Sequence, residues 1–134
     1  KVVGVIPRVI ADAGVARESC DELVLAADLR HRKSVMDARS DAFLVLPGGI
    51  GTYEELFEML TLQQLGVRTR PIVLVDLDGA FGAFHALLRD AIDRRLAEPW
   101  VFRLFASAPD VRGALALMES WDRRALPTKF PQGA

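Results

Sequence analysis

The sequence has little of what several protein classes require. Its single cysteine, Cys20, cannot form a disulfide within the chain, which is typical of a protein from a reducing cytoplasm. His-x-x-His and Cys-x-x-Cys spacings are absent, so we predict no metal, and without a pyridoxal-phosphate lysine motif we predict no organic cofactor. No apolar run reaches the roughly 18 to 20 residues of a membrane span, and no signal-peptide pattern opens the sequence. We therefore expect a cytoplasmic protein.

The sequence also has no large excess of positive or negative charge. The 17 Lys and Arg residues are nearly balanced by 18 Asp and Glu residues, so no basic surface for nucleic acid is predicted. Apolar residues make up 51% of the 134 positions, which is enough for one hydrophobic core. We expect residues 1–122 to form a single domain and residues 123–134, with two prolines and a glycine, to form a C-terminal tail.

Short apolar runs alternate with helical patterns along the chain, and this alternation predicts a parallel α/β sheet. Strands are predicted over residues 2–7, 22–26, 42–46 and 71–76, with a short edge strand near 100–105. Helices are predicted over residues 29–40, 52–65, 81–96 and 111–121, and a loop over 8–20. The first strand is a continuous apolar run, as in the middle of a parallel sheet. We expect it to have neighbours on both sides.

The most informative stretch is the glycine-rich turn from Leu46 to Glu55, between a predicted strand and a predicted helix. Glycines let the backbone approach a ligand closely, and the following helix start favours an anion, so the turn suits a phosphate. It is not a nucleoside-triphosphate loop, because no Lys precedes Thr52, and it lacks the G-x-G-x-x-G pattern. The alternative is structural: Thr52 and Glu55 have the spacing of a capping box, in which both only satisfy the helix start.

Two motifs resemble one known family. The turn Pro47-Gly48-Gly49-x-Gly51-Thr52-x-x-Glu55 resembles the P-G-G-x-G-T-x-x-E motif of the "Lonely guy" (LOG) family of cytokinin riboside 5′-monophosphate phosphoribohydrolases, formerly labelled lysine decarboxylase-like. Upstream, Asp28 to Met36 resembles the family's M-H-x-R-K-x-x-M helix. The resemblance covers nearly the whole chain. It implies a Rossmann-like open parallel sheet with helices on both faces. In the family two further strand–helix units, with another glycine-rich nucleotide-binding turn, precede the first strand, and we expect these units to be missing from this sequence.

The resemblance also implies an activity, the hydrolysis of nucleoside 5′-monophosphates to a free base and ribose 5-phosphate. Arg32 and Glu55 match the residues held to be catalytic in the family. The residues expected to bind substrate are Arg32, Lys33, Gly48, Gly49, Ile50, Gly51, Thr52, Tyr53, Glu54, Glu55 and Thr61. A carboxylate suits this reaction because it can stabilise an oxocarbenium-like state or activate water. A loop Glu of the family falls on Gly14 here; Asp12 and Glu18 are the nearest acids.

The same resemblance bears on the roles of the neighbouring basic residues and on the oligomeric state. Arg can hold a phosphate through two parallel hydrogen bonds, so Arg32 and Lys33 are expected to serve the ligand, while Arg30 is expected to be solvated. His31 stays open between a structural and a functional role. Family members are dimers or larger, so we expect a homodimer at least. Which base is released, a cytokinin or adenine, does not follow from the sequence.

Two other functions fit the same residues. One is a non-catalytic nucleotide or molybdenum-cofactor carrier on the same fold, because the chain also resembles the molybdenum cofactor carrier proteins. The other is a purely structural segment in which Thr52 and Glu55 only cap a helix. The orientation of Glu55, into a pocket or back to its own backbone, distinguishes the structural alternative from the other two.

Overall fold

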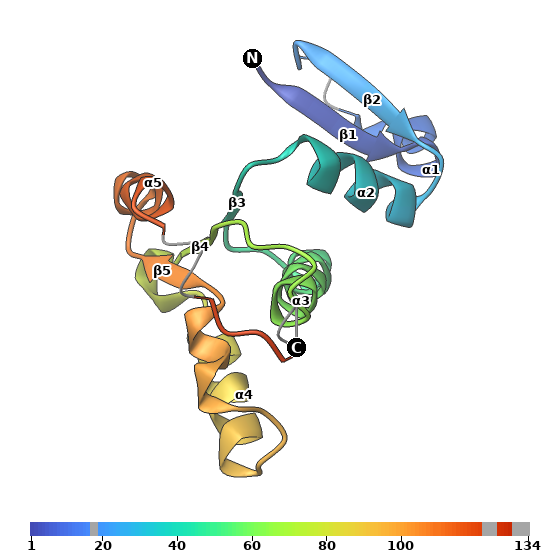
Figure 1. Ribbon diagram of the computed structural model, residues 1–134. Helices are drawn as coiled ribbons and strands as arrows, with labels where there is room; N and C mark the ends of the chain where they lie inside the picture. Colours follow the sequence, from blue (N-terminus) through green and yellow to red (C-terminus); the bar gives the residue numbers. More distant parts are fainter. Residues whose placement is uncertain (17–18, 122–125, 130–134) are drawn as a thin grey trace. The chain divides into compact units, whose positions relative to one another are not determined.

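The computed structural model describes residues 1–16, 19–121 and 126–129 of the chain (Figure 1). The chain divides into two compact units, an N-terminal unit of residues 1–40 and a C-terminal unit that begins at Asp41. Each unit has its own parallel sheet with helices packed against it. Among the described residues, every helix is too short or too polar to cross a membrane.

The N-terminal unit is built on two parallel strands, β1 (Val3–Pro7) and β2 (Glu22–Ala26). They are joined by α1 (Arg8–Ile10) and by η1 (Ala11–Val15), a π-helical turn. The prediction of a loop over residues 8–20 is therefore wrong for its first half, where the backbone turns helically until Gly14 adopts a φ of 77°. A left-handed glycine of this kind breaks a helix. Asp12 lies in this turn, and Glu18 lies outside the described residues.

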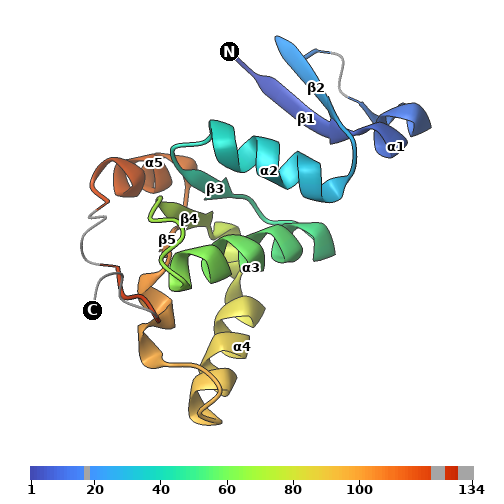
Figure 2. The same cartoon turned by 45° about the vertical axis from the view of Figure 1, so that its right-hand side comes forward.

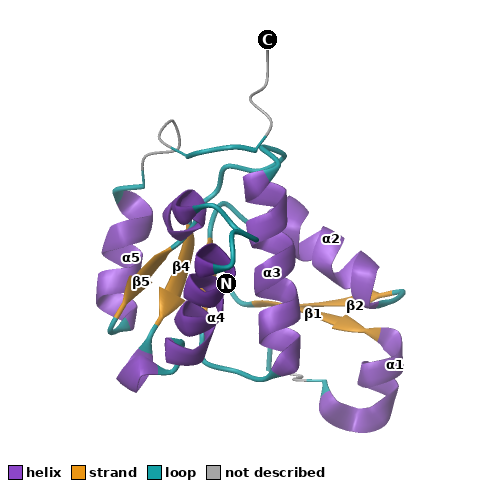
Figure 3. Ribbon diagram, turned by 90° about the horizontal axis from the view of Figure 1, so that it is seen from below, coloured by secondary structure: helices purple, strands orange, loops and turns teal. Residues whose placement is uncertain are grey.

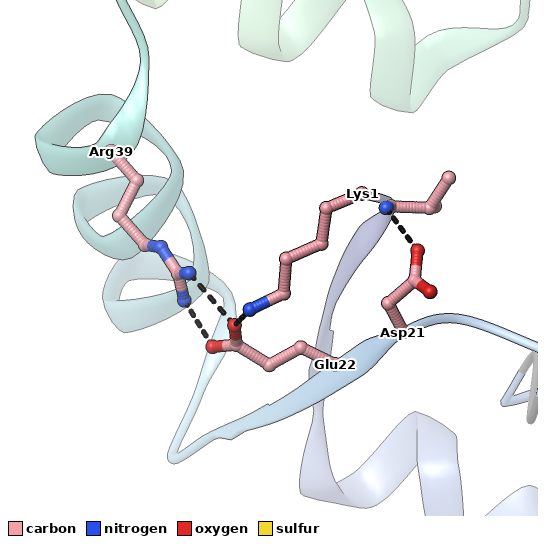
Figure 4. A network of polar contacts seen from close by, with 5 residues as sticks. Lys1, Asp21, Glu22 and Arg39 are labelled. Carbon is pink, nitrogen blue, oxygen red and sulfur yellow. Dashed lines mark hydrogen bonds and ion pairs between the residues drawn. The ribbon is translucent and has the colours of Figure 1, made fainter.

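Helix α2 (Leu29–Arg39) packs on both strands of this unit (Figure 2). Its last turn is tied to β2 by Arg39, whose two terminal nitrogens donate to the Glu22 carboxylate at 2.6 and 3.0 Å. Lys1 donates to the same carboxylate at 2.8 Å (Figure 4). The Arg39 guanidinium, followed by the Lys1 ammonium, lowers the pKa of Glu22 to about 2. Opposite charges within hydrogen-bond distance favour the ionised carboxylate.

The C-terminal unit contains a three-stranded parallel sheet in the order β3-β4-β5. These strands are β3 (Phe43–Val45), β4 (Ile72–Val75) and β5 (Ala106–Ala108). Helices α3 (Ile50–Gln64), α4 (Gly82–Asp93) and α5 (Val111–Glu119) and the 3-10 turns η2 (Leu77–Gly79) and η3 (Pro99–Arg103) complete the unit. The aromatic cluster near residue 100 forms η3, so the predicted edge strand starts later, at Ala106.

The central strand β4 is buried on both faces, as its uninterrupted apolar sequence predicts. Ile72 and Leu74 belong to the larger core, shared with α3 and α4, whereas Val73 and Val75 belong to a second core with α5. Helices α4 and α5 thus cover opposite faces of the sheet (Figure 3). The prediction of a three-layer parallel α/β fold is confirmed.

The end of α3 is fixed by two features. Gly66 follows the helix at a φ of 72°, and its N–H donates to Gln63 while that of Val67 donates to Leu62, as in a Schellman motif. The buried Gln63 side chain also donates to the Leu104 carbonyl at 2.7 Å. The first feature ends the helix, and the second holds α3 against the residue that follows η3. Of the predicted tail, residues 123–125 and 130–134 lie outside the described part of the chain.

Candidate functional site

Helix α3 begins earlier than its sequence predicts, and this decides the role of Thr52. The first helical residue is Ile50 and the N-cap is Gly49, with a φ of −93° and a ψ of −153°. The Thr52 N–H already donates to the Gly49 carbonyl at 3.1 Å, as does that of Tyr53 at 3.3 Å. Thr52 is therefore the third residue of the helix, and no side chain caps its start. The capping-box interpretation of Thr52 and Glu55 is wrong.

An N-cap glycine has a chemical consequence for the helix start. The first N–H groups of any helix lack partners within the helix, and a Ser, Thr, Asp or Asn side chain normally accepts from one of them. Gly49 offers no such side chain. Residues 48–51 are all exposed, so these donors and the positive end of the helix dipole face the surroundings. The arrangement suits an anion that accepts several hydrogen bonds at once.

The three glycines of the turn are not equivalent. A Cβ atom at Gly48 would collide with the Thr52 hydroxyl, so the fold itself requires a glycine there. At Gly49 and Gly51 a Cβ atom would meet nothing within 4 Å, and neither residue has a φ in the left-handed region. The backbone and the packing would therefore accept alanine at both positions. A side chain at Gly49 or Gly51 would instead occupy the open space outside the turn.

The carboxylates of α3 divide between two faces of the helix. Glu55 follows Gly51 and Thr52 by four and three residues, which places it on the same helix face, one turn on. Glu55 is half-buried, and helical side chains lean towards the helix N-terminus, the end that carries the glycine turn. Glu54 and Thr61 share a different, exposed face, seven residues apart. The Thr61 hydroxyl donates to the Phe57 carbonyl of the same helix at 2.7 Å.

Two neighbours of the turn have contrasting surroundings. The Tyr53 ring packs edge-on against Phe81 with 6.2 Å between ring centroids, and it also lies 6.3 Å from Phe84. This anchors the start of α3 to α4. Ile50, in contrast, is 90% exposed at the first position of the helix. An exposed isoleucine beside an uncapped helix start is available to contact a ligand or a partner.

The basic residues predicted to join the site lie at the start of α2 in the N-terminal unit. The half-buried Arg32 donates from Nε to the Val5 carbonyl of β1 at 3.0 Å, and its backbone N–H donates to the Asp28 carbonyl at 2.9 Å. Lys33 is also half-buried. Both follow the carboxyl end of β2, the edge at which ligands of parallel sheets bind. That Arg32 and Glu55 act on one ligand stays a prediction.

Sequence reasoning missed two contacts at this helix start. His31 Nδ1 accepts from the Ala27 N–H at 3.1 Å, and the Asp28 carboxylate accepts from the His31 N–H at 2.7 Å. The signal for the second was present, because an Asp immediately before a helical pattern is a common N-cap. Among the described residues, no three His, Cys, Asp or Glu side chains are placed to hold a metal ion.

The chain matches a known protein family and several of its members. Residues 1–118 match the family described as "possible lysine decarboxylase". The chain belongs to this family. It is 35% identical over 120 residues to the cytokinin riboside 5′-monophosphate phosphoribohydrolase LOG2 of Arabidopsis thaliana, a match that covers 90% of the chain and 56% of the relative. The resemblance to the LOG family is thereby confirmed.

Two further relatives extend the comparison. The probable phosphoribohydrolase LOG6 of Arabidopsis thaliana is 36% identical over 120 residues, covering 90% of the chain and 60% of the relative. The probable phosphoribohydrolase LOGL3 of Oryza sativa is 33% identical, covering 90% and 57%. The chain thus spans somewhat more than half the length of the LOG proteins that it matches.

Proposed function

We propose that this LOG family protein hydrolyses the N-glycosidic bond of nucleoside 5′-monophosphates and releases a free base and ribose 5-phosphate. The observation that carries the proposal is the exposed start of α3, which lacks a side-chain cap and is preceded by a glycine turn. Relatives named as established or probable cytokinin riboside 5′-monophosphate phosphoribohydrolases support it.

In this proposal the 5′-phosphate binds at the start of α3. The N–H groups of residues 49–51 donate to its oxygens, and the Thr52 hydroxyl lies beside the same turn. Ile50 contributes its exposed side chain and Tyr53 its backbone, since the Tyr53 ring is packed on the core. Arg32 and Lys33 add positive charge, Arg32 with a guanidinium already oriented by the Val5 carbonyl. No metal or organic cofactor takes part.

The carboxylates supply the chemistry on the sugar. Cleavage of the bond between C1′ and the base leaves positive charge on the ribose ring, which a nearby carboxylate stabilises. Glu55 lies on the helix face of the glycine turn, one turn away, so a ribose attached to a phosphate there is within its reach. We assign Glu55 to stabilising that charge and to taking a proton from the water whose oxygen bonds to C1′. A proton passes to the base nitrogen that leaves C1′, so the base is released in its neutral form. Glu54 and Thr61, on the adjoining face, bind the substrate, and Arg32 orients it.

The proposal extends to the assembly and the location of the protein. We expect a homodimer at least, which light scattering of the full-length protein would test, since a monodisperse monomer would contradict it. The free Cys20 leads us to place the protein in the cytoplasm. The base, cytokinin or adenine, is decided by contacts other than those to phosphate and ribose.

The test is to incubate the purified full-length protein with AMP and with isopentenyladenosine monophosphate, and to quantify free base and ribose 5-phosphate. Glu55→Gln and Arg32→Ala should each lower kcat at least about 100-fold with folding intact. Glu119→Gln and Arg112→Ala, exposed on α5, are the matched controls and should keep wild-type rates. Release that persists in Glu55→Gln would contradict the assigned chemistry. Tight nucleotide binding without release would favour a carrier.

A further inference from the structure

The start of α2 contains an unusual helix cap. In the common capping box, a Glu or Gln at the third helical position reaches back to the N–H of the N-cap residue. Here Asp28 is the N-cap and accepts from the His31 N–H, while the third helical residue is His31 itself. Its ring reaches back by one residue more, and Nδ1 accepts from the Ala27 N–H at 3.1 Å. The histidine therefore takes the place of the usual acid or amide.

This contact identifies the tautomer of the neutral ring. A backbone N–H can only donate, so Nδ1 must be the unprotonated nitrogen, and the proton of the neutral ring is on Nε2. A doubly protonated ring has no acceptor left and could not make the contact. In the neutral ring that makes this contact, Nε2–H is the remaining donor.

The cap is adjacent to the residue that the proposed reaction needs most. Arg32 follows His31 directly, and its backbone N–H makes the first hydrogen bond of the helix, to Asp28 at 2.9 Å. Its Nε is held by the Val5 carbonyl. The turn from Ala27 to Arg32 is therefore fixed at each end by side chains, and the guanidinium is oriented before any ligand binds. A preoriented guanidinium loses less entropy on binding an anion.

A neutral histidine cap also differs electrostatically from the glutamate of the common capping box. A Glu at position 31 could accept from the same region of backbone, and its charge would favour the helix start. That charge would also lie next to Arg32 and Lys33 and would repel an anionic ligand. We propose that His31 is a positioning residue for a nucleoside 5′-monophosphate: it orients the turn that carries Arg32, and it does so without adding negative charge. This inference rests on the proposed function.

Four variants of the full-length protein test the proposal by steady-state kinetics with AMP. His31→Ala, which loses the cap, should lower kcat/KM about tenfold. His31→Asn places an amide oxygen near the position of Nδ1 and should recover most of that loss. His31→Glu should keep the thermal stability of the wild type but raise KM about tenfold. Asp110→Ala removes the corresponding N-cap of α5, which accepts from the Gly113 N–H at 2.7 Å, and is the matched structural control.

The outcomes separate the inference from its alternatives. The control should lower the Tm about as much as His31→Ala and leave kcat/KM of the folded protein unchanged. An Asn variant no better than Ala, or a Glu variant with the wild-type KM, would overturn the positioning role. Long-range proton–nitrogen NMR on the wild type should show the tautomer protonated at Nε2, and protonation at Nδ1 would equally overturn it. Failure of the wild type to release any base would instead refute the proposed function.

Discussion

Gly51 offers a sharp test of the glycine turn, because the structure gives the fold no reason to have a glycine there. The residue is the second of α3, its φ is not left-handed, and a Cβ atom would meet nothing within 4 Å. Alanine is about 0.5 to 1 kcal/mol more favourable than glycine inside a helix. We therefore expect Gly51→Ala to leave the free energy of unfolding unchanged or to raise it by up to about 1 kcal/mol.

The same methyl group should impair function. A phosphate seated on the N–H groups of residues 49–51 approaches the backbone to about 3 Å between nitrogen and oxygen, and a Cβ atom projects into the space outside the turn. Loss of two hydrogen bonds to a charged group, at about 1.5 to 3 kcal/mol each, corresponds to a rise in KM for AMP of at least about 100-fold. The assay combines urea unfolding with kinetics on AMP.

A matched variant controls for the substitution itself. Gly82 is the first residue of α4, is exposed, and would also accept a Cβ atom without any contact within 4 Å. Gly82→Ala should change the free energy of unfolding by no more than about 1 kcal/mol and should leave KM for AMP unchanged. A Gly51→Ala protein with the wild-type KM would refute the reasoning, because the open space beside the turn would then have no ligand to accommodate.

Three further predictions concern the fold. Arg39 and Lys1 lower the pKa of Glu22 from 4.5 to about 2, so the stabilising contribution of the Glu22 carboxylate is present above pH 4.5 and fades as pH falls towards 2. The difference in thermal stability between wild type and Glu22→Gln should therefore shrink over that pH range. A difference that stays constant would contradict the ion pair. Gln63→Ala removes a buried hydrogen bond and leaves a cavity, so urea unfolding should show a loss of about 2 to 4 kcal/mol, with a loss below about 1 kcal/mol arguing against the Leu104 contact. Gly66→Ala should cost about 1 kcal/mol because of its φ of 72°, and an unchanged urea midpoint would rule out the left-handed cap.

The strands were predictable because their apolar runs are short and bounded by polar or turn residues. Residues 22–26 form β2 as predicted, and the uninterrupted run at 72–75 becomes the strand buried on both faces. Helix ends were harder to predict, because they depend on single residues. Arg95 adopts a left-handed φ of 59°, so α4 ends at Asp93, before the apolar pattern does.

The strand–glycine–helix order of the turn was predictable from the sequence, whereas the residue at which the helix begins was not. The strand–glycine–helix order predicted an exposed anion site, and the structure has an uncapped helix start there. The spacing of Thr52 and Glu55 wrongly indicated a capping box. A glycine can also be an N-cap, and the sequence does not reveal which residue takes that position. The Val5 carbonyl that orients Arg32 lies 27 residues away in sequence, so no local pattern could have indicated it.

The central claim is that the turn before α3 holds the 5′-phosphate of the substrate. The most direct measurement compares kcat/KM of the full-length wild type for AMP and for adenosine, which differ only in that phosphate. We predict release of adenine and ribose 5-phosphate from AMP, with adenosine cleaved at least about 1,000-fold less efficiently, because it lacks every charge-assisted contact to the turn. Equal efficiency on the two substrates would contradict the account.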